Sequence, residues 1–173
     1  NGSGWWIGRE GLPAAFAPRD GRAPGSSALA AAAEAWAGSA DSLPGRLARD
    51  PSAFRTVAAF APVVLECARA GDAEALRIVR KAGWYAIEAV RSLGRLAFDG
   101  RAFRYSFIGG GRGAAPLWNS ADREALEAVG AVEVPPAGQP LDGAEHLAAL
   151  TQEGTARFGA LVNESHHQGK STR

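Results

Sequence analysis

Three consecutive glycines, Gly109, Gly110 and Gly111, are the residues whose type and spacing most clearly point to chemistry. They directly follow residues 103–108, which alternate in polarity and are rich in residues that favour β-strands. A glycine run at the end of a strand lets the backbone approach a flat ligand, and it leaves N–H groups free to bind that ligand. The pattern predicts a nucleotide-binding loop, with a purely structural turn as the alternative.

A dinucleotide site is a second interpretation of the same glycines. Gly109, Gly111 and Ala114 satisfy the pattern G-x-G-x-x-A, and Glu133 falls near the end of the next predicted strand. In a dinucleotide fold, however, the helix opens directly at the glycines so that its N-terminus faces the pyrophosphate. Here residues 116–118 intervene before a helix can begin. The spacing therefore favours the nucleotide loop or the turn.

Composition and charge narrow the range of partners. With 19 basic and 18 acidic residues and a net charge of +1, the chain offers no basic face, and we expect no nucleic-acid partner. The longest apolar runs, such as residues 57–65, are far shorter than the roughly 20 residues that a membrane span requires, so we expect no membrane partner. The single cysteine, Cys67, excludes an internal disulfide and an all-cysteine metal site, which favours a reducing, cytoplasmic location.

The elements that must position the glycines are mainly helices. Helix caps and apolar periodicity predict two parts, a helical part over residues 1–98 and a strand–helix–strand–helix part over residues 99–162. The second part favours a parallel pair of strands. The expected elements are a helix from Ser3 that Gly11 and Pro13 interrupt, helices over 28–37, 51–70 (kinked at Pro62) and 73–96, a strand over 103–108, a helix over 120–129, a strand over 131–134, a helix over 142–162, and a disordered tail over 163–173.

The first residues resemble a segment from the middle of a folded chain. The chain begins at Asn1, contains no methionine, and runs from a small-residue loop straight into the apolar segment Trp5-Trp6-Ile7. We therefore expect it to be a fragment of a longer protein.

Several segments, in the right order, resemble the N-acetylglucosamine kinase and benzoyl-CoA reductase activator branch of the actin-like ATPase superfamily. The resemblance covers nearly the whole chain up to about Leu150, and order and spacing make it more specific than any single motif. Its segments are a small-residue loop and helix (2–10), a turn (20–22), paired helices (57–62 and 70–72), the adenosine motif (107–111) and a closing helix start (140–144).

This resemblance implies a fold and a reaction. The fold would be α/β and helix-rich: a partial ribonuclease H-like C-terminal lobe with a helical insertion and a short parallel strand pair, spanning residues 1–162. The reaction would transfer the γ-phosphoryl group of ATP, with Mg²⁺, to the 6-hydroxyl of N-acetylglucosamine or a related amino sugar. The phosphate loop and the base would lie in an N-terminal lobe before Asn1, so we assign no catalytic and no metal-binding residue here, and expect that lobe and a second copy of the protein as partners.

The resemblance also assigns binding residues. Alanine and glycines would leave a flat, uncrowded slot for a purine, and the first N–H groups of the helix after the small-residue loop have no partner within the helix and could bind a sugar oxygen. The assigned residues are Gly2, Ser3 and Gly4 for the sugar, and Ala58, Gly109, Gly110 and Gly111 for the adenosine of ATP. Cys67 does not match the cluster cysteines of the activators, which favours the kinase branch. A non-catalytic helical interaction domain, with the glycines as a turn, is the alternative of a different class.

Overall fold

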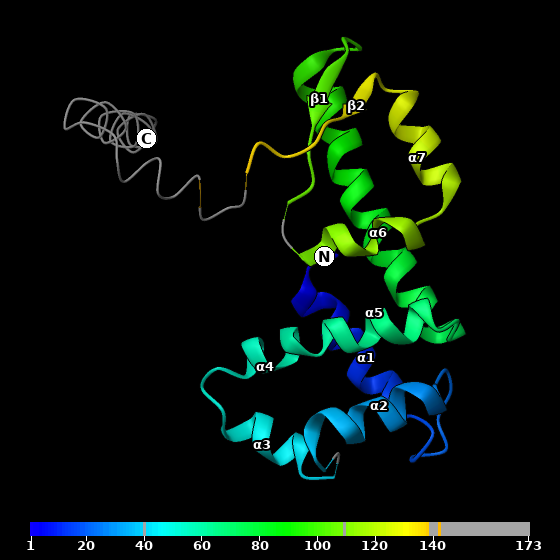
Figure 1. The fold of residues 1–173 in the computed structure, drawn as a ribbon, viewed down its shortest axis with the longest axis vertical. Coiled ribbons are helices and arrows are strands. Elements are labelled where there is room, and N and C mark those ends of the chain that lie inside the picture. The colour runs from blue at the N-terminus through cyan, green and yellow to red at the C-terminus, as the bar shows by residue number, and fades with distance from the viewer. Residues whose placement is uncertain (40, 109, 139–141, 143–173) are drawn as a thin grey trace, which may run out of the picture. The chain divides into compact units, whose positions relative to one another are not determined.

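The fold is known from a computed structural model, which describes residues 1–39, 41–108, 110–138 and 142. The chain divides into two compact units, residues 1–135 and 136–173, and the architecture below is that of the first. It is helix-rich with one short parallel sheet, as the sequence predicts (Figure 1). Its elements are α1 (Gly4–Phe16), α2 (Ser27–Ala37), α3 (Leu43–Arg49), α4 (Ala53–Ala59), α5 (Ala61–Arg69), α6 (Ala73–Leu93), a π-helical turn η1 (Gly94–Phe98), β1 (Phe103–Tyr105), a 3-10 helix η2 (Gly110–Leu117), α7 (Ser120–Glu127) and β2 (Ala131–Glu133).

Three predicted helix starts are confirmed by their capping hydrogen bonds. A side-chain oxygen at the N-cap accepts a backbone N–H of the first turn and so satisfies one of the helix's unpaired donors. The caps are Ser3, which accepts from Trp6 N at 3.3 Å, Ser26, which accepts from Leu29 N at 2.9 Å, and Asp72, which accepts from Ala75 N at 2.8 Å.

The expectation that Gly11 and Pro13 would interrupt the first helix is wrong. Helix α1 continues through both residues to Phe16. Close packing, and not a helix end, explains the glycine at position 11, because a Cβ there would stand 2.4 Å from Val64 Cγ2. Pro13 removes one helical hydrogen bond, and the buried residues around it, among them Leu12, hold the last turn in place against that loss.

The predicted kinked helix over residues 51–70 is two helices. Helix α4 ends at Ala59 and α5 begins at Ala61, with the fully buried Phe60 between them. Pro62 stands in the first turn of α5, where its missing N–H costs nothing. The short helix α3, which precedes them, was not predicted from the sequence.

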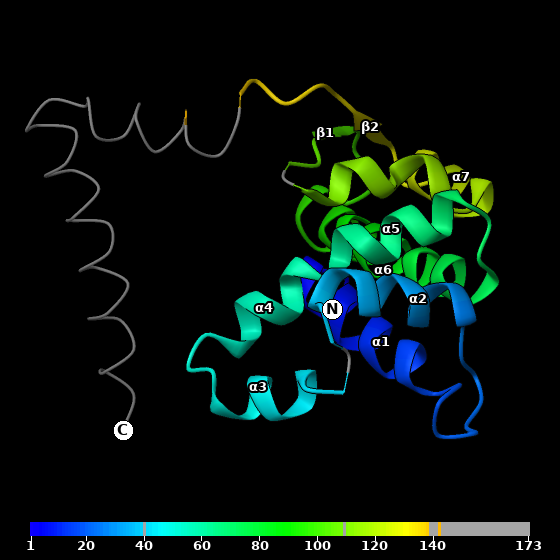
Figure 2. The ribbon, with the colours of Figure 1, turned by 60° about the horizontal axis from the view of Figure 1, so that its bottom comes forward.

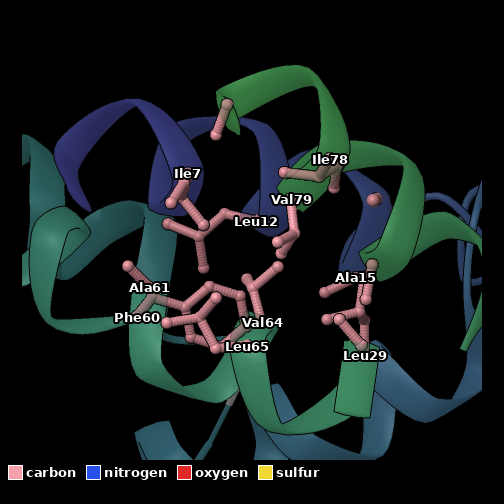
Figure 3. Packing of buried hydrophobic residues seen from close by; sticks show 14 of the residues in the cluster. Ile7, Leu12, Ala15, Leu29, Phe60, Ala61, Val64, Leu65, Ile78 and Val79 are labelled. Carbon is pink, nitrogen blue, oxygen red and sulfur yellow. The ribbon is translucent and has the colours of Figure 1, made fainter. Parts of the chain in front are cut away.

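Helices α1, α2, α5 and α6 pack side by side around the main core (Figures 1 and 2). Figure 3 shows their apolar side chains converging in the centre. Each fully buried aliphatic or aromatic side chain contributes roughly 1.5–3 kcal/mol by leaving water. The side chains that are fully or almost fully buried include Leu29, Phe60, Val64, Ile78 and Val79. Gly71 as a helix stop and Asp72 as the following cap predict that the two helices form a hairpin. Helices α5 and α6 do pack in this way, with Gly71 between them at a φ of 91°.

The buried face of α6 differs from the predicted one. Helical spacing of the apolar residues in this segment predicts a buried stripe of Leu76, Val79, Gly83, Ile87, Val90 and Leu93. The structure instead buries Ala75, Ile78, Val79, Ala82, Gly83 and Ile87. Alanine and glycine carry much of this contact, because short side chains let neighbouring elements come close. Leu93 is 52% exposed, and α6 ends there rather than at residue 96.

The two strands are parallel, as predicted, and pair Phe103 with Ala131 and Tyr105 with Glu133. Helix α7 connects them, and its Leu126 joins Ile87, Phe103 and Ala131 in a second, smaller core. The first strand ends three residues earlier than predicted, at Tyr105. The predicted helix over 142–162 and the tail over 163–173 lie outside the described residues, apart from residue 142.

Candidate functional site

A cavity of about 320 Å³ is lined by residues from the start of α1, the middle of α6 and the segments on either side of the glycine run. It is bounded on one side by the small-residue loop that the sequence analysis assigned to the sugar. The other walls come from α6 and from the segment on either side of the glycine run. Its lining comprises Gly2, Ser3, Gly4 and Ile7, then Ala82, Gly83 and Ala86, and finally Phe107, Ile108, Ala114 and Trp118.

Gly2 is held at this site by the backbone of α6. Its φ is 83°, a conformation that residues with a Cβ rarely adopt, and a Cβ would stand 2.8 Å from the Ala82 carbonyl oxygen. Ser3 already uses its side-chain oxygen to cap α1, although its hydroxyl hydrogen remains available as a donor. Packing therefore explains Gly2, and capping explains Ser3, without reference to a ligand.

Gly4 differs from Gly2, because packing does not require a glycine there. A Cβ at this position would stand 3.8 Å from Ala61 Cβ and 3.9 Å from the Ala58 carbonyl oxygen, which are ordinary van der Waals contacts. An alanine would fit. Gly4 is thus the residue of the predicted sugar loop at which the absence of a side chain leaves room that packing does not use.

The residues assigned to adenosine are only partly brought together. Ala58 is half-buried on α4 and lies near Gly4, but it is not among the described residues that line the cavity. Gly110 and Gly111 begin the 3-10 helix η2 rather than an open loop, which corrects the predicted strand–loop junction. Gly109 lies outside the described residues. The cavity reaches Ile108 on one side of the glycines and Ala114 on the other.

Trp118 forms a wall of the cavity that the sequence analysis did not assign to the site. Its indole lies directly against α6 at Gly83, where a Cβ would stand 2.5 Å from Trp118 Cδ1. Phe107 packs against it edge-on, with ring centroids 5.1 Å apart. Gly83 was the available signal, since a glycine in the middle of a long helix costs about 1 kcal/mol and usually has a packing reason.

The described residues that line the cavity carry no titratable side chain, so the cavity suits an uncharged group such as a sugar or a purine ring. Two side chains outside the cavity have raised pKa values. Burial raises the pKa of the Cys67 thiol, and the charge of Asp72 adds to the effect. Burial, followed by the charge of Glu133, raises the pKa of the Tyr105 phenol. Within residues 1–39, 41–108, 110–138 and 142, no three His, Cys, Asp or Glu side chains are grouped so as to hold a metal ion.

None of the protein-family models, curated proteins or solved structures with which the chain was compared matches it. In the described part of the chain, every helix is too short or too polar to span a bilayer.

Proposed function

We propose that this chain supplies sugar and adenosine contacts in an ATP-dependent kinase that phosphorylates N-acetylglucosamine or a related amino sugar at its 6-hydroxyl. The observation that carries the proposal is the shared cavity. Gly2, Ser3 and Gly4 line it together with Ile108, which precedes the three glycines. Two segments that were assigned separately to a sugar and to a nucleotide thus border one space, although about 100 residues separate them in sequence.

The size of the cavity limits what it holds. At about 320 Å³ it stands at the lower end of the roughly 300–1,000 Å³ that is typical of small-molecule sites. That volume holds one ring, which we assign to the sugar, so the adenosine would meet the cavity only at the wall beside the glycine run. The phosphates of ATP and the Mg²⁺ they carry would therefore extend beyond it, toward an N-terminal lobe that supplies the phosphate loop and the base.

A partial ribonuclease H-like lobe is the fold we propose for this chain. The parallel pair of β1 and β2 with the connecting helix α7 is the arrangement that supports this assignment. The preceding helices α1–α6 would be the helical insertion together with the helices that flank the sheet.

A helical interaction domain is the second candidate, and a specific observation favours it. Gly8 and Gly11 are explained by close helix packing, since a Cβ would stand 1.9 Å from the Val57 carbonyl oxygen and 2.4 Å from Val64 Cγ2 respectively. Gly2 is explained in the same way. Under this alternative the glycines serve only the packing, and the cavity binds nothing.

Isothermal titration of the chain with Mg²⁺–ATP and, separately, with N-acetylglucosamine distinguishes the two candidates. Heat of binding from both ligands supports the kinase proposal. If neither ligand binds at 10 mM, the result supports the interaction domain, because KM values seldom exceed about 1 mM. The chain by itself should not turn over N-acetylglucosamine, because no catalytic residue is assigned to it.

The variant Gly110→Val tests the adenosine assignment. A branched side chain should fill the purine slot and weaken ATP binding about tenfold or more while leaving the thermal transition in place. Gly113→Val is the matched control in the same 3-10 helix, since a Cβ there would meet only the flexible Arg69 guanidinium at 3.3 Å. Equal ATP affinity in the Gly110 variant and the wild type would remove the assignment.

A further inference from the structure

A second hollow, of about 400 Å³, lies between α6 and the start of α7 and is separate in its lining from the cavity described above. Four of its residues, Arg77, Arg80, Lys81 and Trp84, follow one another at helical spacing and so share one face of α6. Asn119, the N-cap residue of α7, and Asp122, in its first turn, border the hollow from the other side. We propose that this hollow binds a sugar phosphate, with the phosphate on the cationic side chains and the sugar ring on Trp84. The inference does not depend on the proposed kinase function.

The cations that would hold the phosphate are Arg80 and Lys81. Arg77 is already engaged, because its guanidinium donates two hydrogen bonds to the Glu74 carboxylate at 2.6 and 2.8 Å. Arg80 and Lys81 are exposed, and neither forms an ion pair with any residue in the described part of the chain. Two adjacent cations without a carboxylate partner can each donate charge-assisted hydrogen bonds to a phosphate dianion.

The platform for the ring is Trp84, whose side chain is 40% exposed. Lys81 Nζ lies 4.0 Å from the centroid of the Trp84 ring, so the ammonium is held beside the aromatic surface rather than extended into water. A ligand whose phosphate draws the Lys81 ammonium away from the ring therefore places its next atoms against the face of Trp84 that the ammonium leaves. An aromatic ring next to a cation suits a phosphate ester with a non-polar face better than a bare anion.

One acidic group in the hollow opposes an anion. The Asp122 carboxylate accepts a hydrogen bond from Asn119 Nδ2 at 3.4 Å. Its single negative charge is outnumbered by Arg80 and Lys81, which form no ion pair within the described residues, so the hollow remains attractive to a dianion. Removing that charge should therefore tighten binding, an effect that a purely structural Asp122 would not produce.

Isothermal titration of the 173-residue chain at low ionic strength tests the proposal, with glucose 6-phosphate, inorganic phosphate and glucose as probes. We expect glucose 6-phosphate to bind more tightly than phosphate, and glucose not to bind in this hollow. The double variant Arg80→Gln/Lys81→Gln should weaken glucose 6-phosphate binding at least about tenfold, Trp84→Leu should weaken it about fivefold, and Asp122→Asn should strengthen it.

A second double variant removes two positive charges elsewhere on the surface. It distinguishes loss of a local binding site from a general decrease in positive charge. Arg55 and Arg104 are exposed and lie outside the hollow, so Arg55→Gln/Arg104→Gln should leave the affinity within about twofold of wild type. Gly4→Leu, in the first cavity, should also leave it unchanged. The proposal is overturned if the Arg80/Lys81 variant binds as tightly as wild type, if the control variant loses as much, if Asp122→Asn weakens binding, or if inorganic phosphate binds as tightly as glucose 6-phosphate.

Discussion

The Ser26 hydroxyl donates a hydrogen bond of 2.7 Å to the Asp72 carboxylate, across 46 residues of sequence. Each of the two residues also caps a helix, Ser26 at the start of α2 and Asp72 at the start of α6. Ser26 is only 5% exposed and Asp72 is half-buried, so the bond between them is partly shielded from water. One short contact therefore fixes two helix starts to each other, and α6 in turn forms a wall of the candidate site.

Replacing Asp72 should destabilise the chain more than loss of an ordinary cap. Asp72→Ala removes the acceptor of Ala75 N and leaves the buried Ser26 hydroxyl without its partner. Together these losses should lower the free energy of unfolding by about 2–3 kcal/mol. Asp72→Asn keeps a side-chain oxygen for the cap and should cost less than half as much. Urea unfolding of both variants measures the difference, and equal losses would contradict the role assigned to the pair.

Gly8 and Gly4 of α1 should differ strongly in their tolerance of the same substitution to alanine. At Gly8 a Cβ would stand 1.9 Å from the Val57 carbonyl oxygen, so Gly8→Ala must separate α1 from α4 and should cost about 3 kcal/mol. At Gly4 the nearest contact would be 3.8 Å, so Gly4→Ala should change stability by less than about 0.5 kcal/mol. Thermal melting compares the variants directly, and a stable Gly8→Ala protein would show that the helices are not so close.

Because Gly83 lies against the Trp118 indole, Gly83→Ala should both weaken the packing of α6 and change the shape of the cavity. A methyl group at residue 83 would meet the indole at 2.5 Å and must displace it, at a cost of about 1–3 kcal/mol. Gly45→Ala is the control, because a Cβ there would meet only the end of the Arg49 side chain, at 3.4 Å. Gly83→Ala should lower the melting temperature and Gly45→Ala should not. A wild-type melting temperature for Gly83→Ala would contradict the predicted packing of Trp118.

Local signals in the sequence predicted the helix starts and the parallel strand pair, because a cap needs only one side chain and a few following residues. The caps Ser26 and Asp72 could be read in this way, but the bond between them could not, since it depends on how α2 and α6 pack. For the same reason the sequence did not predict that α1 continues through Pro13. Tertiary packing there outweighs the local cost of a proline inside a helix. Among the residues that line the cavity, Gly2, Ser3 and Gly4 were singled out from the sequence and Trp118 was not, and the sugar role assigned to the loop stays a prediction.

The thiol of Cys67 should make stability fall at alkaline pH. Its pKa is raised in the folded chain, first by burial and then by the charge of Asp72, while the unfolded chain should have the ordinary value of about 8.5. Because the pKa is higher in the folded chain than in the unfolded chain, the protonated thiol's contribution to the free energy of unfolding is fully present below the unfolded pKa. That contribution is lost as the pH rises through the folded pKa. Urea unfolding at several pH values should show this decline in the wild type and a smaller one in Cys67→Ser.

Alkylation provides an independent measure of the same pKa. Because the thiolate is the reactive form, iodoacetamide should modify Cys67 more slowly in the folded chain than in urea at pH 8.5, and its rate should rise at higher pH than in the unfolded chain. Asp72→Asn removes one of the two main causes and should move the rate profile toward ordinary pH values. A folded profile that coincides with the unfolded one would show that neither cause acts on the thiol.

Substitutions at Gly4 separate a ligand-binding role of this residue from a packing role. An alanine fits at this position, with its nearest contact at 3.8 Å, so Gly4→Ala serves as the control for a larger side chain at the same place. Gly4→Leu should crowd the cavity and weaken the binding of N-acetylglucosamine at least about tenfold, while the affinity for Mg²⁺–ATP changes little, because the adenosine is assigned to the separate glycine run. In the full-length kinase of the proposal, the same substitution should raise the KM for the amino sugar and leave the KM for ATP nearly unchanged.

If Gly4 serves only the packing of α1, Gly4→Leu should instead lower the melting temperature and weaken the binding of both ligands together. Titration with both ligands and a melting curve of each variant decide between the two, and a parallel loss in Gly4→Leu with a lowered melting temperature would remove Gly4 from the sugar site.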